Sequence, residues 1–228
     1  MNKMPLSNKE KLSNIKFHAE EVLRHGFKDR YTIHPIFTFI KILTDKITAN
    51  YAAETITEPI NERKVYGECF DIKNLMYSNV NCVVCKERSD KDISVNLCTC
   101  PLILSPWNSS KICNLNISIG SSNNPWKYDI INHRLDLYYP LGVFVTYGGG
   151  NHSTLIGKLK GKATMPLTRY RILDLTPLYN EIQFDGENYI DRKNGEIIEK
   201  ALNFEFGCIF EIGSLILEYE VYFKGIKI

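Results

Sequence analysis

Three consecutive glycines, residues 148–150, are the feature of this sequence that most constrains its fold. They stand between an apolar segment with strand character, 141–147, and a segment with helical character, 154–160. Glycine permits positive φ angles and close backbone approach, and the first turn of a helix leaves amide N–H groups unpaired at its positive dipole end. The glycines therefore predict a strand, loop and helix whose loop can hold a phosphate or carboxylate; the simpler interpretation is an ordinary turn.

The residues that follow the glycines supply candidate chemistry for an anion site. His152 can act as an acid, a base or a phosphate contact, and Asn151 or Ser153 can cap the helix through a side-chain oxygen. Basic residues near the loop can neutralise an anion, although a solvated lysine face explains them equally well. The residues predicted to bind phosphate or nucleotide are Gly149, Gly150, Asn151, Ser153, Thr154, Lys158, Arg169 and Arg171, and Lys160 and Lys162 belong to the same basic cluster.

Residues 141–174 resemble the signature region of the ParB/sulfiredoxin superfamily. The matching positions are Gly150, His152, Lys158, Leu159, Gly161 and Pro166. Members of the superfamily bind nucleoside phosphates at this turn, so the resemblance implies a pocket for ATP, GTP or CTP at residues 150–154. The sequence departs from the pattern at Ser153, where the superfamily has an arginine that grips phosphate. Another cation must take its place, and Lys158, Arg169 and Arg171 are the candidates.

A wider resemblance covers residues 100–220 and points to an uncharacterised family of bacterial and mobile-element proteins. The residues that carry it are Pro106, Trp107, Trp126, Asn132, His133, the 139–142 and 149–153 segments, Asp185, Gly186 and the 210–213 segment. This resemblance strengthens the fold and the site but implies no reaction. A role in a mobile element or in phage defence is a hypothesis that rests on it.

Composition bounds the class of protein. A chain of 228 residues with 44% hydrophobic and 24% charged residues can bury a core of one domain, or one domain with an appendage. The longest apolar run of the first half, 36–43, contains a lysine and is too short to cross a bilayer. With no signal-peptide pattern, we expect a cytoplasmic protein that does not enter membranes. The net charge of +2 permits a nucleic-acid partner but does not demand one.

Four of the seven cysteines fall into two close pairs, which suggests a structural zinc site. The polar residues 86–92 between the pairs are typical of a hairpin tip, which would bring the four thiolates together. The alternative is free thiols in strands. The predicted metal ligands are Cys82, Cys85, Cys98 and Cys100. Cys69, Cys113 and Cys208 resemble ordinary core residues, although Cys113 is close enough in sequence to replace one ligand.

The N-terminal part of the chain predicts a helical pair. Residues 8–26 show an amphipathic pattern that Gly26 ends, and a more apolar helix should run from Pro35 to about residue 53. Strands are expected at 65–72 and within 80–104. We therefore predict an α+β fold: a small mixed sheet with a ParB/sulfiredoxin-like strand-loop-helix-strand core and the N-terminal helical pair. The predicted domains are a helical segment, 1–60, and a core domain, 61–228, with the zinc clip at 82–100.

A second Asn-His pair, Asn132 and His133, lies upstream of the glycine loop. His133 is a candidate general base or metal ligand, with Asp129, Asp136 or Glu211 as its acidic partner. This prediction holds only if His133 and His152 converge in the fold. If they do not, His133 is a surface residue before a strand.

The C-terminal part combines hairpins with one apolar helix. Asp185-Gly186 and Asn194-Gly195 are turn signals for antiparallel pairing, and residues 203–221 predict a buried helix. Glu211 lies within this helix, so its carboxylate must be paired or stand at an exposed edge. We favour the exposed position.

Two classes of function fit these patterns. The first is a nucleotide- or phosphate-binding protein that carries out phosphoryl transfer or nucleic-acid cleavage, with His152 and His133 as catalytic residues. The second is a catalytically inactive module that docks a protein partner. A DNA-binding regulator is a weaker third, because no helix-turn-helix with a basic recognition helix stands out.

Overall fold

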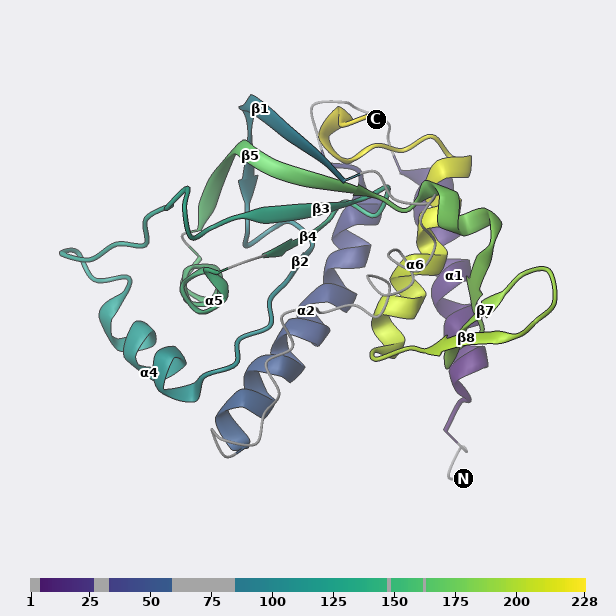
Figure 1. Ribbon diagram of the computed structural model, residues 1–228, viewed down its shortest axis with the longest axis horizontal. Coiled ribbons are helices and arrows are strands. Elements are labelled where there is room, and N and C mark those ends of the chain that lie inside the picture. Colours follow the sequence, from purple (N-terminus) through teal and green to yellow (C-terminus); the bar gives the residue numbers. More distant parts are fainter. Residues whose placement is uncertain (1–4, 27–32, 59–84, 147–148, 162) are drawn as a thin grey trace.

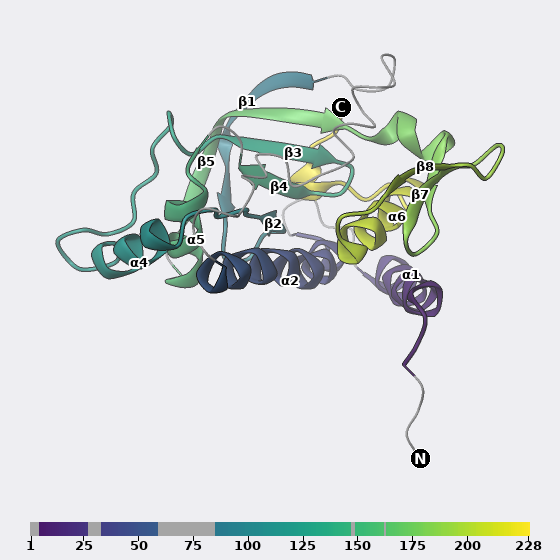
Figure 2. The same cartoon turned by 60° about the horizontal axis from the view of Figure 1, so that its bottom comes forward.

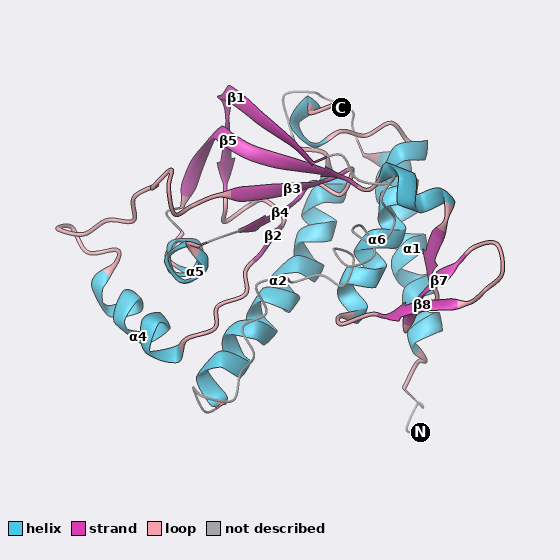
Figure 3. Ribbon diagram, viewed as in Figure 1, coloured by secondary structure: helices cyan, strands magenta, loops and turns pink. Residues whose placement is uncertain are grey.

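The computed structural model describes residues 5–26, 33–58, 85–146, 149–161 and 163–228 of the chain. These residues form an α+β protein in which five-stranded and three-stranded sheets are combined with helices, as the sequence predicts (Figures 1 and 3). The helices are α1 (Asn8–His25), α2 (Pro35–Thr57), α4 (Ser109–Ser118), α5 (Asn151–Leu159) and α6 (Phe204–Glu218), with short 3-10 turns at Thr176–Asn180 and Phe223–Gly225. The strands are β1 (Cys85–Asn96), β2 (Leu102–Ile103), β3 (Leu135–Tyr139), β4 (Val143–Thr146), β5 (Thr164–Asp174), β6 (Ile182–Phe184), β7 (Asn188–Asp191) and β8 (Ile197–Lys200).

The predicted N-terminal helical pair is confirmed. Helix α1 begins with a capping box in which Ser7 and Glu10 exchange side-chain and backbone hydrogen bonds, and Gly26 is its C-cap. Helix α2 begins at Pro35 and runs four residues beyond the predicted end, because residues 54–57 continue its backbone hydrogen bonding. Figure 2 shows α2 lying along the five-stranded sheet, where the Thr48 hydroxyl donates to the Leu102 carbonyl at 3.2 Å.

The five-stranded sheet has the order β1-β5-β3-β4-β2 and is mixed. Strands β3 and β4 pair antiparallel through a tight turn, and β5 returns parallel to β3 after α5 has crossed between them. The segment from β4 to β5 therefore has the strand-loop-helix-strand order expected from the glycines. Strand β4 covers 143–146; residues 147 and 148 lie outside the described part of the chain.

The expected hairpin between the cysteine pairs is wrong. Residues 86–92 are part of the long strand β1, which pairs antiparallel with β5 from Cys85 opposite Leu173 to Asn96 opposite Thr164. Leu173 and Thr164 are nine positions apart along β5, about 30 Å of extended strand, so residues 86–92 do not fold back as a hairpin. The polar residues 86–92 fit an edge strand as well as a loop, and only the pairing with β5 decides between the two.

The C-terminal part matches the prediction in its turns and its helix. Strands β6, β7 and β8 form an antiparallel meander whose turns lie at Asp185-Gly186 and Asn194-Gly195. Helix α6 is rich in apolar residues and largely buried. The predicted exposed position of Glu211 is wrong, because its side chain is 4% exposed and forms an ion pair with Lys16 of α1 at 2.7 Å.

One hydrophobic core joins the N-terminal helices to the sheets. It contains Leu23 of α1 and Phe37 of α2 together with Phe144 of β4 and Phe210 of α6. The helical segment and the α+β segment thus bury apolar surface against each other, which stabilises both. Across the described residues, no helix combines the length and the apolar character that a membrane span requires.

Candidate functional site

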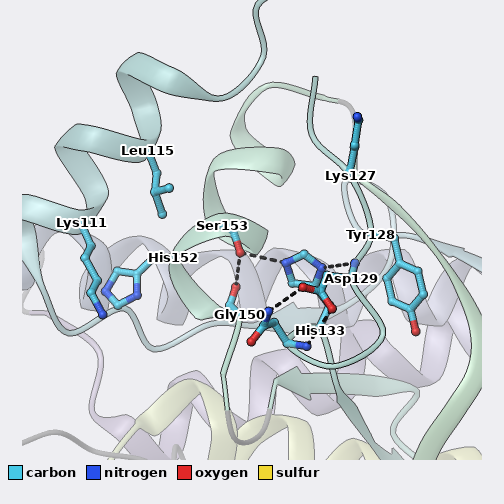
Figure 4. A pocket seen from close by; sticks show the side chains of 10 residues that line it. Lys111, Leu115, Lys127, Tyr128, Asp129, His133, Gly150, His152 and Ser153 are labelled. Atoms are coloured by element: carbon cyan, nitrogen blue, oxygen red, sulfur yellow. Dashed lines mark hydrogen bonds between the residues drawn. The ribbon is translucent and has the colours of Figure 1, made fainter. Parts of the chain in front are cut away.

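A cavity of about 450 Å³ opens at the start of α5, directly after the glycines. Figure 4 shows α4 residues on one side of it, the start of α5 at its centre and the loop before β3 on the other side. Three elements distant in sequence thus meet at one place. The lining residues are Lys111, Leu115, Lys127, Tyr128, Asp129, Asn132, His133, Gly150, His152 and Ser153.

Gly150 fixes the geometry of the helix start. It is the N-cap of α5 with a φ of 76°, which the glycine-based argument anticipated. A Cβ at this position would lie 2.6 Å from the Asn132 carbonyl oxygen and 2.7 Å from His133 Cδ2, so glycine also permits the close approach of the neighbouring turn. Helix α5 begins three residues before the predicted 154, which places His152 and Ser153 in its first turn.

The predicted capping by Asn151 or Ser153 is wrong, since no side chain caps α5. The Asn151 side-chain oxygen instead accepts hydrogen bonds from Ser105 N–H at 2.9 Å and from the Thr146 hydroxyl at 2.6 Å. Asn151 therefore ties α5 to β4 and to the loop after β2. The amide N–H groups of the first turn therefore receive no hydrogen bond from a capping side chain.

His152 is buried and acts as a hydrogen-bond acceptor. Its Nε2 accepts from Trp107 N–H at 3.2 Å and from Asn108 N–H at 3.1 Å. Burial, helped by the nearby charge of Lys111, lowers the pKa of His152 to about 4. The ring is therefore neutral at pH 7 with its proton on Nδ1, and it holds the chain that enters α4 against the start of α5.

His133 lies on the same cavity, so the two histidines do converge. Asp129 N–H donates to His133 Nδ1 at 2.9 Å, and His133 Nε2 lies 2.8 Å from Ser153 Oγ. Because Nδ1 accepts, the neutral ring carries its proton on Nε2 and donates to Ser153. The Ser153 hydroxyl in turn donates to the Gly150 carbonyl at 3.2 Å. Burial lowers the pKa of His133 and so favours this neutral form.

The three acidic residues considered as partners of His133 lie in different places. Asp129 is adjacent, but its carboxylate accepts hydrogen bonds from Ile131 N–H and from the backbone and side chain of Asn132, and these bonds lower its pKa. Asp136 pairs with Arg171, and Glu211 lies on α6 beside Lys16. Within the described ranges, no group of three or more His, Cys, Asp or Glu residues is arranged to hold a metal ion.

The basic residues expected to replace the missing arginine point to other partners. Lys158 forms an ion pair with Asp45 of α2 at 2.6 Å, and Arg171 makes two hydrogen bonds, of 2.7 and 2.6 Å, to the buried carboxylate of Asp136. Lys160 donates to the carbonyls of Asn116 and Ile119 at the end of α4. Arg169 is exposed on β5 and is not among the lining residues, Thr154 is buried within α5, and Lys162 lies outside the described residues.

The cations that do line the cavity are Lys111 and Lys127, which sequence reasoning missed. Lys111 lies on α4, a helix that we did not predict. A signal for it exists: Asn108 is the N-cap, and its side chain accepts from Lys111 N–H at 2.8 Å. Lys127 lies in the loop between α4 and β3, next to Trp126 and Tyr128 in the chain.

Aromatic rings support the loop side of the cavity. The Trp126 ring stacks on His133 with centroids 5.1 Å apart and donates its indole N–H to the Ser153 carbonyl at 2.9 Å. This approach requires Gly157 in α5, where a Cβ would lie 2.5 Å from the indole. Gly157 therefore sets the distance between α5 and the loop that carries His133.

The cysteines are in part outside the described residues. Cys69 and Cys82 belong to the segment 59–84, and only the backbone of Cys85 is described. Cys98, which is half-buried, donates its thiol to the Lys158 carbonyl at 3.5 Å, and Cys100 and Cys208 are buried. Burial raises the pKa of Cys100 to about 11. Cys113 is exposed on α4, so its predicted place in the core is wrong. The four-cysteine zinc site stays a prediction, and its hairpin is absent.

A model of one protein family matches residues 2–223, nearly the whole chain. The chain belongs to DUF6710, a family of unknown function. This membership confirms the expected place in an uncharacterised family. No curated protein and no solved structure matches the chain. The site of this DUF6710 member must therefore be interpreted from its own geometry.

Proposed function

We propose that this DUF6710 protein binds the phosphate group of a nucleotide in the cavity at the start of α5. The observation that carries the proposal is the meeting of three positive features in one cavity. They are the uncapped first turn of α5, Lys111 from α4, and Lys127 from the loop before β3. Helix N-termini and lysine ammonium groups both favour phosphate, the first through fixed N–H donors and the second as point charges.

The charges of the other lining groups leave this positive character intact. His133 and His152 are neutral at pH 7 because burial lowers both pKa values. Asp129 carries the one carboxylate among the lining residues, and three N–H donors already engage it. Lys111 and Lys127 therefore outweigh the single negative charge.

The cavity has a suitable size for such a ligand. About 450 Å³ lies within the range of roughly 300–1,000 Å³ that is common for small-molecule sites. The resemblance of residues 141–174 to the ParB/sulfiredoxin superfamily supports a nucleoside phosphate, with ATP, GTP and CTP as the first ligands to test. In this proposal Lys111 and Lys127 take the place of the arginine that Ser153 replaces.

We propose binding without a chemical step by the histidines. A general base for Ser153 would need an unprotonated nitrogen facing its hydroxyl, whereas His133 directs a protonated Nε2 at Ser153. His152 Nε2 is occupied by two backbone N–H groups. Phosphoryl transfer or nucleic-acid cleavage would require a rearrangement of these bonds when ligand enters.

Ligand-induced stabilisation tests the proposal. The melting temperature of the protein should rise with ATP, GTP or CTP and less with sulfate, because a ligand that binds only the folded state stabilises it by mass action. Lys111→Ala and Lys127→Ala should each weaken nucleotide binding about tenfold, the loss of one charge-assisted contact. Lys193→Ala, which removes an exposed lysine from the β7–β8 turn, is the matched control. Equal shifts of the melting temperature with nucleotide in the parent protein and in the three lysine variants would refute the proposal.

The second candidate is the partner-docking module. Phe17 of α1 and Ile42 and Ile56 of α2 are 61%, 66% and 58% exposed, and exposed apolar residues on these helices are what such a module needs. Single exposed apolar residues are common, so this function ranks second. A role in a mobile element or in phage defence stays a hypothesis, which genomic neighbours would test.

A further inference from the structure

An aromatic ring accompanies each of the two lysines of the cavity. Lys111 Nζ lies 4.6 Å from the centre of the Trp107 ring, which is 36% exposed. On the other side, Lys127 precedes Tyr128, whose ring is half-buried on the cavity wall. Tyr128 thus lines the cavity beside Lys127, and Trp107 lies at its edge, where it contacts the lining residues Lys111 and His152.

The start of α5 separates these two pairs. Figure 4 shows Lys111 and His152 on one side of Gly150 and Ser153, and Tyr128 on the other. Trp107 belongs to the first side, because its ring meets His152 edge-on with centroids 5.3 Å apart. From one side to the other, the site therefore has Trp107 with Lys111, then the first turn of α5, then His133 and Asp129, and then Tyr128, with Lys127 next to it in the chain.

We infer that the ligand is a single-stranded nucleic acid, with one phosphodiester at the first turn of α5 and its two neighbouring bases on Trp107 and Tyr128. The inference rests on the proposed phosphate site and deepens it. A mononucleotide has one base and would leave one aromatic ring unused, whereas a single strand has a base on each side of every internal phosphate. Aromatic stacking beside a basic groove is the common way in which proteins hold unpaired bases.

A duplex does not fit the same features. Bases in a duplex stack on each other and present only their edges, so rings such as Trp107 and Tyr128 find no face to cover. The net charge of +2 also gives a weaker field than duplex-binding domains have. The chemistry at the site suits DNA and RNA strands alike, because neither ring nor lysine reads the 2′-hydroxyl.

His152 holds the backbone of Trp107 and Asn108 in position. Its Nε2 accepts from the N–H groups of Trp107 and Asn108, and Asn108 caps α4, which carries Lys111. His152 is thus a positioning residue for this side of the site. Loss of the ring acceptor should loosen Trp107 and Lys111 together.

The test compares strand, monomer and duplex on the full chain. Titration calorimetry should show that oligothymidylate of about 12 nucleotides binds at least about tenfold tighter than thymidine monophosphate, since each stacked base adds affinity. Oligouridylate of the same length separates RNA from DNA, and a hairpin duplex should bind more weakly than either strand. Affinity for oligothymidylate should fall with salt, with a slope near −1.4 in log–log form for two phosphate contacts.

Variants assign the two kinds of contact. Trp107→Ala and Tyr128→Ala should each weaken strand binding about fivefold or more and leave the salt slope unchanged. Lys111→Ala should reduce the slope by about 0.7. Phe17→Ala removes an exposed aromatic ring from α1, away from the cavity, and is the matched control.

The results separate this inference from the proposed function. If oligothymidylate binds no tighter than the monophosphate, or if the aromatic variants match Phe17→Ala, the single-strand inference is wrong while the phosphate site stands. If neither monophosphate nor strand binds and Lys111→Ala changes nothing, the proposed function itself is wrong. Circular dichroism and melting of each variant identify any that fail to fold, and Trp107→Phe then replaces the alanine variant as a test of the indole.

Discussion

Replacing Gly150 by alanine tests the close contact between the start of α5 and the turn that carries His133. Gly150 has a φ of 76°, and a Cβ there would lie 2.6 Å from the Asn132 carbonyl oxygen. Gly195, in the β7–β8 turn, has nearly the same φ of 75°, but a Cβ there meets no atom within 4 Å. The two alanine variants thus share the backbone strain and differ in the packing.

The size of each effect follows from these geometries. An alanine in the left-handed region costs about 1–2 kcal/mol, and its lower entropy in the unfolded chain offsets roughly 0.4–1 kcal/mol. Gly195→Ala should therefore lower the free energy of unfolding by about 1 kcal/mol. At Gly150 the clash is with backbone, which must shift, and such overpacking adds about 1–3 kcal/mol. Gly150→Ala should lose about 2–4 kcal/mol in total.

Urea unfolding and thermal melting measure the difference. In a protein of this length 1 kcal/mol shifts the melting temperature by about 2–4 °C. The difference of about 1–3 kcal/mol between the variants should therefore make Gly150→Ala melt about 2–12 °C below Gly195→Ala. Gly150→Ala should also bind nucleotide more weakly, while Gly195→Ala should bind like the parent chain. Equal melting temperatures for the two variants would refute the close approach of residues 132 and 133 to α5.

Three further predictions concern buried polar groups. Glu211→Ala should lower the free energy of unfolding by about 2–4 kcal/mol, because Phe184 N–H loses its acceptor. Glu211→Gln should lower it by less than half as much. Equal losses for the two variants in urea titrations would contradict this. The free energy of unfolding should be highest above pH 6.5 and fall by up to about 3 kcal/mol towards pH 4. The folded chain lowers the pKa of His152 to about 4, so between these pH values the unfolded chain binds a proton that the folded chain does not. His152→Gln should flatten that pH profile, and an unchanged profile would exclude the residue as its cause. Arg171→Lys should lose stability, because one ammonium cannot replace the two bonds to buried Asp136; lost nucleotide affinity at parental stability would instead assign Arg171 to the ligand.

Local sequence patterns predicted the elements whose signals are short-range. The amphipathic pattern of residues 8–26 with its terminal glycine, the proline at residue 35 and the two Asx-Gly turns each depend on residues close together in the chain, so their sequence is sufficient. The glycines before α5 belong to the same class, because the positive φ of Gly150 is a property of that residue alone. The α+β class followed from these elements.

Interactions across the chain were beyond those patterns. Residues 86–92 are polar enough for a loop, yet pairing with β5 makes them a strand. Glu211 could be an exposed or a paired carboxylate, and only the packing of α1 on α6 brings Lys16 to it. Helix α4 escaped prediction because its apolar face is weak, with Ile112 its one buried residue.

The sequence by itself determined the glycine N-cap and the helix that follows it, because both are local and carry their own amide donors. The tertiary structure decided which side chains line the cavity beside that helix start, where we propose the phosphate site. Lys158, inside the same helix, turns to Asp45, while Lys111 and Lys127 arrive from other elements. The reason is physical: the conformation of a residue follows from its neighbours in sequence, but the partner of a charge is whichever opposite charge the folded core places within a few ångströms.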